Sequence, residues 1–415
     1  MSVIRPFRGL RPKPELAKKV ASPPYDVLSS DEARAMVKDN PDSFLRVNKS
    51  EVDFPAETSL YSDEIYRRGK ENLDRLVNDA IMIRDDSPCF YLYRLTWKGR
   101  GQTGIVCLTS VEEYDQGKIK KHEHTRPSKV KDRANHIVAL GAQVGPVLSI
   151  FKNRPQIAET FGRITAAAPE VDFLADDDVQ HQLWPVSDKA NIDALTNDFA
   201  ALHELYIADG HHRSQSASEV CRRMTEANPA HTGQELYNFF LNVVFPDDQL
   251  RILPYNRVVR DLNSLTRDGL LEKAAKSFEI QDAAAPVSPD ENDHRVGFYC
   301  NGKWGALKAK AGTFDNSKPS ESIDAAILYE NLLRPVLGIE DIRTDERIDF
   351  IGGIRGTAEL VRLVDSDTWK IAFSLGPVTV EQLLAVADAG EVMPPKSTWF
   401  EPKLRSGMVI NLLND

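Results

Sequence analysis

The most prominent apolar run in this 415-residue sequence is short, covering only residues 239–245 (FFLNVVF). A helix needs about 20 consecutive apolar residues to cross a bilayer, so this run predicts no membrane span. A short continuous apolar run is instead typical of a strand that is buried on both faces. The run therefore favours a soluble protein in which this segment crosses a hydrophobic core.

Strand-like and helix-like segments are mixed along the rest of the chain. Residues 90–96 and 103–110 predict two strands joined by a hairpin turn. Helical spacing of apolar residues predicts helices over residues 60–80 and 323–337, and Ser29 or Ser30 with the acids that follow predicts a helix start. This mixture predicts an α/β (α+β mixed) protein.

The charge balance limits the classes of partner. The chain carries 52 Lys and Arg against 62 Asp and Glu, a net charge of −10. A general nucleic-acid coat protein needs a basic surface, so we expect no nucleic-acid partner. The four cysteines form no CxxC pair, and the basic N-terminus lacks the apolar region of a secretory signal. We expect a cytoplasmic protein with no membrane partner.

Residues 206–213 (YIADGHHR) carry the strongest chemical signal. A short strand that ends at Asp209-Gly210 and turns into a helix presents free backbone N–H groups and a helix dipole to an anion. Gly210 lets a phosphate approach the backbone, and Arg213 offers a planar fork for phosphate oxygens. Asp209 can hold Mg²⁺ or accept a proton. The alternative is a plain strand–turn–helix joint with Asp209 as a cap and both histidines on the surface.

A second cluster, residues 120–127 (KKHEHTRP), mixes cations, imidazoles and one carboxylate. Phosphoryl transfer needs cations to neutralise charge, which Arg126 can supply, and a carboxylate base, which Glu123 can supply. His122 and His124 can also ligate a metal, although the sequence shows neither a third close ligand nor a His-Glu-x-x-His helix. The alternative is a solvated basic loop.

Three further segments offer ligand contacts. In residues 393–403 (MPPKSTWFEPK), a Pro-rich frame positions Lys396 and Lys403, but the glycines of a Walker loop are absent. A rigid tail packed by aromatic residues explains this segment equally well. Residues 22–26 place Tyr25 and Asp26 at the end of an extended segment that can line a pocket, and residues 253–257 offer Asn256 and Arg257 in a similar way.

Together these segments resemble a widespread bacterial and archaeal family that is labelled a domain of unknown function and is also given a ParB-like label. The resemblance spans residues 22–398, nearly the whole chain. The matching segments are residues 22–27 (SPPYDV), 122–125 (HEHT), 131–133 (KDR), 208–213 (ADGHHR), 253–257 (LPYNR) and 393–398 (MPPKST).

Residues 206–217 are also similar to the strand–Gly–(His/Arg)–Arg–helix box of the ParB/sulfiredoxin superfamily, where this turn holds nucleotide phosphates. Archaeal free-serine kinases of that superfamily carry a similar box. The resemblance implies a ParB/sulfiredoxin-like mixed-sheet core that binds phosphate over residues 1–260. It further implies a C-terminal α+β region over residues 261–415 that contributes to the same site. The catalytic Cys of sulfiredoxin is not matched, because His211 or His212 occupies that turn.

The residues and the resemblance together favour a small-molecule kinase. It would use Mg²⁺ and transfer a phosphoryl group from ATP, ADP or pyrophosphate to a small hydroxylated metabolite, with free serine as one candidate. The donor and the acceptor are thus its expected partners. The predicted site residues are Glu123, Asp209 and His211 for catalysis; Gly210, His212, Arg213, Arg126 and Lys396 for phosphate; Tyr25, Asp26, His122, Thr125, Asn256 and Arg257 for substrate; and Asp209 for the metal.

Two alternatives remain open at the level of the sequence. One is a metal-dependent phosphohydrolase or nuclease that uses His122, His124, His211 and His212. The other is a nucleotide-binding, ParB-like regulatory protein, which predicts a basic helix-turn-helix region after residue 213.

Overall fold

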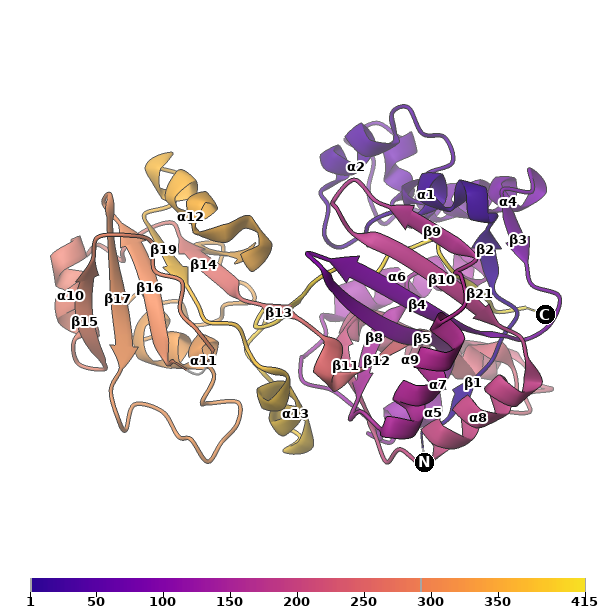
Figure 1. The fold of residues 1–415 in the computed structure, drawn as a ribbon. Helices are drawn as coiled ribbons and strands as arrows, with labels where there is room; N and C mark the ends of the chain where they lie inside the picture. The colour runs from indigo at the N-terminus through magenta and orange to yellow at the C-terminus, as the bar shows by residue number, and fades with distance from the viewer. Residues whose placement is uncertain (1, 292, 415) are drawn as a thin grey trace. The chain divides into compact units, whose positions relative to one another are not determined.

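Two separate sheets organise the chain, and each belongs to its own unit. The computed structural model describes residues 2–291 and 293–414. Unit 1 comprises Met1–Lys120, Thr125–Leu250 and Pro402–Asp415, and unit 2 comprises Lys121–His124 and Arg251–Glu401. Both ends of the chain belong to unit 1 (Figure 1). Strands and helices occur in both units, so the mixed α/β class that the sequence predicts is confirmed.

Unit 1 is built on a nine-stranded mixed sheet in the order β6-β11-β8-β12-β5-β4-β10-β9, with β1 paired to β5. The apolar run of the sequence forms β12, which pairs with β8 in parallel and with β5 in antiparallel register. From residue 240 onward β12 is buried, as the sequence predicts. The strands of unit 1 are β1 (Ile4–Arg5), β2 (Leu10–Pro12), β3 (Met82–Arg84), β4 (Phe90–Trp97), β5 (Arg100–Ser110), β6 (Ile119–Lys120), β7 (Ala142–Gln143), β8 (Val147–Phe151), β9 (Val171–Leu174), β10 (Gln180–Val186), β11 (Leu205–Asp209), β12 (Phe239–Pro246) and β21 (Asn411–Leu412).

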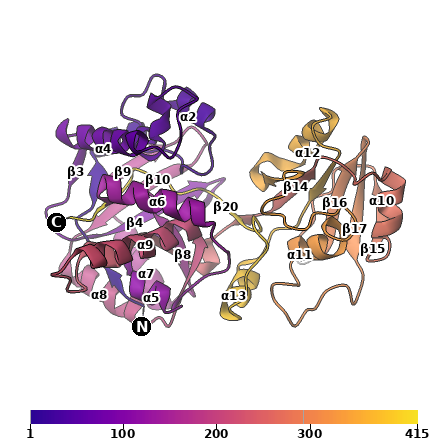
Figure 2. The same ribbon diagram turned by 180° about the vertical axis from the view of Figure 1, so that it is seen from behind.

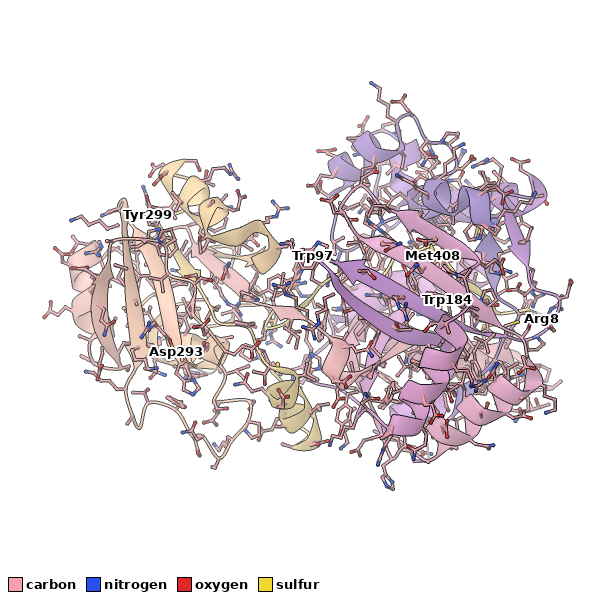
Figure 3. All side chains as sticks on the ribbon, viewed as in Figure 1. Arg8, Trp97, Trp184, Asp293, Tyr299 and Met408 are labelled. Carbon is pink, nitrogen blue, oxygen red and sulfur yellow. The ribbon has the colours of Figure 1, made fainter. Side chains whose placement is uncertain are left out.

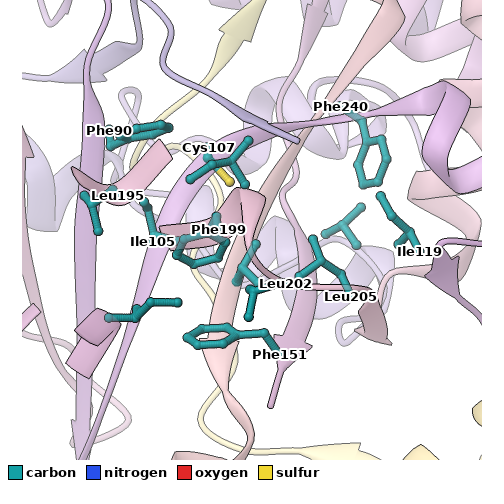
Figure 4. Close-up of a cluster of buried hydrophobic side chains, with 14 of the residues drawn as sticks. Phe90, Ile105, Cys107, Ile119, Phe151, Leu195, Phe199, Leu202, Leu205 and Phe240 are labelled. Carbon is teal, nitrogen blue, oxygen red and sulfur yellow. The ribbon is translucent and has the colours of Figure 1, made fainter. Parts of the chain in front are cut away.

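Helices pack on this sheet to form the main core of unit 1 (Figure 4). Apolar side chains of alternate strand residues meet those of α5, α7, α8 and α9, while α6 and α9 pack side by side (Figure 2). Trp184 of β10, labelled in Figure 3, contributes to this core and donates its Nε1 proton to the carbonyl of Ala167 at 2.8 Å. The helices are α1 (Ala17–Val20), α2 (Ser30–Val37), α3 (Leu45–Asn48), α4 (Asp63–Asn78), α5 (Val111–Asp115), α6 (Pro127–Leu140), α7 (Pro155–Thr165), α8 (Lys189–Ala200) and α9 (His211–Ala227), with 3-10 turns η1 (Pro14–Leu16), η2 (Ser50–Asp53), η3 (Leu236–Asn238) and η4 (Asp247–Gln249).

The C-terminal segment of unit 1 is held by a buried polar network. Tyr93 of β4 and His181 of β10 are both buried, and their Oη and Nδ1 atoms lie 2.7 Å apart. Arg405 donates its Nε proton to Nε2 of His181 at 3.4 Å and a second proton to Asp177 at 2.5 Å. Tyr93 and His181 are buried and Asp177 is exposed, so these partners fix the path of the chain around Arg405 from the core to the surface.

Unit 2 contains a six-stranded antiparallel sheet in the order β15-β17-β16-β19-β14-β18. Neighbouring strand residues point to opposite faces, so Val259 packs with α10 and α11 while Val258 packs with α12. Tyr299, labelled in Figure 3, lies on the α12 side. The elements are β13 (Ile252–Leu253), β14 (Tyr255–Val259), α10 (Arg267–Ala274), β15 (Phe278–Ala283), β16 (Arg295–Cys300), β17 (Lys303–Ala309), α11 (Asp324–Leu328), the π-helical turn η5 (Tyr329–Leu333), β18 (Ile348–Gly352), the 3-10 turn η6 (Gly353–Arg355), α12 (Gly356–Asp365), β19 (Ile371–Ser374), α13 (Val380–Asp388) and β20 (Trp399–Phe400).

Local signals fixed some helix ends correctly and others wrongly. The predicted start of α2 is confirmed, because Ser29 and Glu32 form a reciprocal capping box. The helix expected over residues 323–337 is shorter than predicted, because α11 continues into the π-helical turn η5 and this turn ends at Leu333, two residues before Pro335. Pro335 has no N–H to donate and so cannot continue an α-helix. No described helix has both the length and the apolar character needed to cross a bilayer.

Candidate functional site

The joint between β11 and α9 turns sharply at Gly210. Its φ of +96° is a left-handed conformation that residues with a Cβ rarely adopt. A Cβ at Gly210 would also lie 3.1 Å from Nε and Cζ of Arg213, which folds back over the turn. Both constraints favour glycine here. The predicted strand–turn–helix joint is confirmed, but α9 begins at His211, so the two histidines and Arg213 form its first turn.

Arg213 lies between two carboxylates. Its Nη2 is 3.6 Å from Oδ1 of Asp209 and 3.9 Å from Oδ2 of Asp26, and Nη1 donates to the carbonyl of Pro146. Burial alone would lower the pKa of Arg213, but the charges of Asp26 and Asp209 raise it above its ordinary value. The Nε atom is buried and finds no hydrogen-bond partner within the described part of the chain. The guanidinium is therefore charged and has one unused donor.

A second arginine, Arg133 of α6, stacks on Tyr25. Its Cζ lies 4.3 Å from the ring centroid, and its Nε donates to Asp132 at 2.8 Å. Burial raises the pKa of the Tyr25 hydroxyl above its ordinary value, so this hydroxyl stays protonated.

Tyr25, Arg133 and Arg213 line one small cavity in unit 1. Its volume is about 30 Å³, roughly the space of one water molecule. Asn48 lines it too, and its buried Nδ2 has no partner among the residues that the structure describes. Two residues that line the cavity, Asn48 and Arg213, thus each have a buried donor without a hydrogen-bond partner among the described residues, and such donors suit an oxygen acceptor.

A lysine from the far end of the sequence completes this cluster. Lys403 donates from Nζ to Oδ2 of Asp209 at 2.9 Å. Its neighbourhood is fixed by two backbone bonds of 3.0 and 2.9 Å between Ser22 and Ser406. The same bridge therefore anchors the segment that carries Lys403 and the segment that carries Asp26.

Other predicted residues of unit 1 lie around the same turn. The backbone N–H of Arg126 donates to Nε2 of His212 at 3.0 Å, which brings these two residues together. The side chain of His211 is buried. Thr125 belongs to unit 1 as well.

The remaining predicted residues belong to unit 2. Asn256 accepts the backbone N–H of Leu375 at 3.1 Å, and His122 accepts that of Met393 at 2.8 Å through its carbonyl. Arg257 and Lys396 also lie in this unit, as do His124 and Glu123. Sequence reasoning placed all these residues in one site. They belong to two units, and their meeting in one site stays a prediction.

The list of site residues predicted from the sequence omits Arg133 and Lys403, although Lys403 was noted in a segment that can contact a ligand. Both lie in basic segments that were singled out, but nothing local marks which cation of such a segment faces a carboxylate. Within residues 2–291 and 293–414, no three His, Cys, Asp or Glu side chains gather into a group that could hold a metal ion.

The sequence matches the family described as "Protein of unknown function (DUF1015)" over residues 4–327. The chain belongs to the DUF1015 family. A comparison of this DUF1015 protein with curated proteins finds no significant match.

Solved structures show a distant likeness to the DUF1015 chain. A free serine kinase in complex with AMP is 13% identical, with 72% of this chain and 86% of that chain covered and a TM-score of 0.36. A conserved hypothetical protein from Pyrococcus furiosus is 12% identical, with 74% and 95% covered and a TM-score of 0.37. SbnI with a C-terminal truncation, from Staphylococcus aureus, is 12% identical, with 74% and 87% covered and a TM-score of 0.35.

Proposed function

We propose that the protein is a kinase that holds the phosphates of a small-molecule donor at the Gly210 turn of unit 1. The observation that carries this proposal is the position of Arg213 at the start of α9, between Asp26 and Asp209 and with an unused buried donor. The donor would be ATP, ADP or pyrophosphate. The acceptor would be a small hydroxylated metabolite, for which the family resemblance suggests free serine.

The start of α9 is open to an anion in a way that several other helices are not. Side-chain oxygens cap the first turns of α2, α5, α8, α10 and α13. The residue before α9 is Gly210, which has no side chain to offer. Its first-turn N–H groups and the positive end of a 17-residue helix can therefore face phosphate oxygens.

Charge supports the same assignment. Arg213 and Lys403 point their donors at the carboxylates of Asp26 and Asp209. A phosphate that enters this cluster would accept from the same donors and from the unused Nε of Arg213. Phosphoryl transfer depends mainly on positioning and charge neutralisation, and these two cations are of the kind that it needs.

The transfer step needs a proton acceptor, and Asp26 suits this role. The hydroxyl oxygen of the acceptor forms a bond to the terminal phosphorus, and the bond from that phosphorus to the bridging oxygen of the donor breaks. The hydroxyl proton passes to a carboxylate. Asp209 is held by Lys403, whereas the side chain of Asp26 is 40% exposed and only flanks Arg213. We therefore assign the proton to Asp26 and a positioning role to Asp209.

A carboxylate of this cluster also fits a donor-bound Mg²⁺. Asp209 provides a hard oxygen ligand beside Arg213. Mg²⁺ is commonly held by one or two carboxylates together with substrate phosphates and water, so no larger protein cluster is needed. When bound, the ion would neutralise phosphate charge.

The test is a turnover screen of the full chain by phosphorus NMR, with each donor and Mg²⁺ against a panel of hydroxylated metabolites that includes serine. In the pair that reacts, Arg213→Ala should lower turnover by about 10³-fold. Asp26→Asn should lower kcat more than it raises KM, because it removes the proton acceptor.

Arg223→Ala is the matched control for Arg213. Arg223 lies on the same helix but binds Glu219 and Asn135, outside the cluster. It should leave turnover unchanged. Full turnover by the Arg213 variant with every donor would place the reaction elsewhere.

A further inference from the structure

Unit 2 contains a buried arginine without a carboxylate partner. The side chain of Arg257 on β14 is only 1% exposed and is the largest fully buried side chain of the described chain. No Asp or Glu of the described chain lies within ion-pair distance of it. Burying a cation costs several kcal/mol unless an opposite charge compensates. The structure therefore raises the question of which anion balances this charge.

The present partners of Arg257 are neutral. Nη1 donates to the carbonyl of Tyr255, Nη2 donates to that of Pro395 at 3.5 Å, and the guanidinium carbon lies 5.1 Å from the ring centroid of Phe350. Burial lowers the pKa of Arg257 to about 9, so the group is still a cation at neutral pH but gains from a nearby anion.

A second cation lies beside the same tyrosine. The Nζ atom of Lys396 is 5.4 Å from the ring centroid of Tyr255, and no described carboxylate pairs with it. Lys396 has a φ of +58°, which is uncommon for a lysine. Two contacts hold its loop: Ser397 donates to the carbonyl of Pro394, and Met393 donates to that of His122. The fold thus keeps an exposed lysine in a strained position beside Tyr255, which is two residues from Arg257 on β14.

A small polar cavity adjoins Arg257. It has a volume of about 10 Å³ and is lined among others by Tyr255, Ser397 and Asp324. Asp324 is the only acidic residue in this lining, and its Oδ1 lies 3.2 Å from Nδ1 of His294. The acid is therefore engaged by a histidine and not by Arg257.

We propose that Arg257 and Lys396 form an oxyanion site within unit 2, which takes a carboxylate or phosphate group of a small metabolite. A planar guanidinium binds either group through two parallel hydrogen bonds, and the ammonium adds a point charge. The site is built from residues of unit 2 alone, and it requires no particular reaction at the phosphate site proposed for unit 1.

The test uses the full chain with Arg213→Ala, which weakens the unit 1 site. Inorganic phosphate and glycolate are titrated separately by calorimetry at constant ionic strength. We expect at least one of them to bind, and we expect Lys396→Ala to weaken that binding about tenfold. Binding of phosphate alone identifies a phosphorylated ligand, and binding of glycolate alone identifies a carboxylate. Absence of both would overturn the proposal.

Lys98→Ala is the matched control for Lys396. Lys98 also has a positive φ, of +51°, and its Nζ lies 4.4 Å from the ring centroid of Trp97, but it belongs to unit 1. Its variant should bind as the parent does. Because Arg257 is buried, Arg257→Lys is checked first for an unchanged urea transition. Unchanged affinity for phosphate and glycolate in both the Lys396 and the folded Arg257 variants would refute the unit 2 site. Unchanged pyrophosphate binding by Arg213→Ala would refute only the unit 1 proposal.

Discussion

Replacing Gly210 by alanine tests the phosphate turn most directly. The substitution forces a Cβ into a backbone with φ of +96°, which costs about 1–2 kcal/mol. The new atom would also lie 3.1 Å from the Arg213 guanidinium, so this guanidinium has to move. A hydrogen bond from a charged group contributes about 1.5–3 kcal/mol. Losing one such bond therefore predicts about 10- to 100-fold weaker binding of pyrophosphate.

Gly141→Ala separates strain from function. Gly141 ends α6 with a φ of +63°, and a Cβ there would meet nothing within 4 Å. Both variants should lose about 1–2 kcal/mol of unfolding free energy in urea titrations. Only Gly210→Ala should lose pyrophosphate affinity in calorimetry. If Gly210→Ala binds pyrophosphate as tightly as Gly141→Ala does, the turn does not hold phosphate and the reasoning fails.

Three further outcomes are expected. Lys403→Met should weaken pyrophosphate binding about tenfold and reduce its salt dependence, because it removes the ammonium that lies 2.9 Å from Asp209; calorimetry at two salt concentrations checks this. Burial, with a nearby arginine, lowers the pKa of both His136 and His181 to about 3, against about 6.5 in the unfolded chain. Between pH 6.5 and pH 3 these two histidines therefore bind protons in the unfolded chain but not in the folded chain. The unfolding free energy should fall in this range by up to about 1.4 kcal/mol per pH unit for each histidine, and above pH 6.5 the two histidines should not affect it. Urea titrations at several pH values should show that the unfolding free energy of His136→Gln and of His181→Gln depends less steeply on pH than that of the parent. An unchanged pH dependence would contradict the lowered histidine pKa values. Ser29→Ala should destabilise α2 by about 1 kcal/mol, seen as faster amide exchange in its first turn; equal exchange rates would mean that the cap contributes nothing.

Local chemistry made parts of the fold predictable. The hairpin of β4 and β5, the run that forms β12 and the capped start of α2 depend on residues within a few positions of one another. The order of the sheet does not. β12 lies between β8 and β5, which are separated from it by about ninety residues or more, and an apolar strand carries no mark of its partners.

The candidate site likewise has a part that the sequence predicted and a part that it did not. The strand–Gly–helix joint at Gly210 was visible in the sequence and is confirmed, and so is the family. Its phosphate-binding role, and the relation to the ParB/sulfiredoxin superfamily, stay predictions. Nothing in the sequence showed that Asp26 and Lys403 would meet at this joint, because each belongs to an irregular segment whose path is set by tertiary contacts such as the Ser22–Ser406 bridge.

The return of residues 402–414 to unit 1 has a consequence for how the protein is made. A ribosome synthesises all of unit 2 before it reaches Lys403, so the nascent chain carries Asp209 for nearly two hundred residues without its lysine partner. Strand β21, which pairs with β7, arrives later still. Unit 2 can fold while unit 1 still lacks its C-terminal segment, since domains generally fold as units during synthesis. The Gly210 turn acquires its full set of charges only after unit 2 has been synthesised.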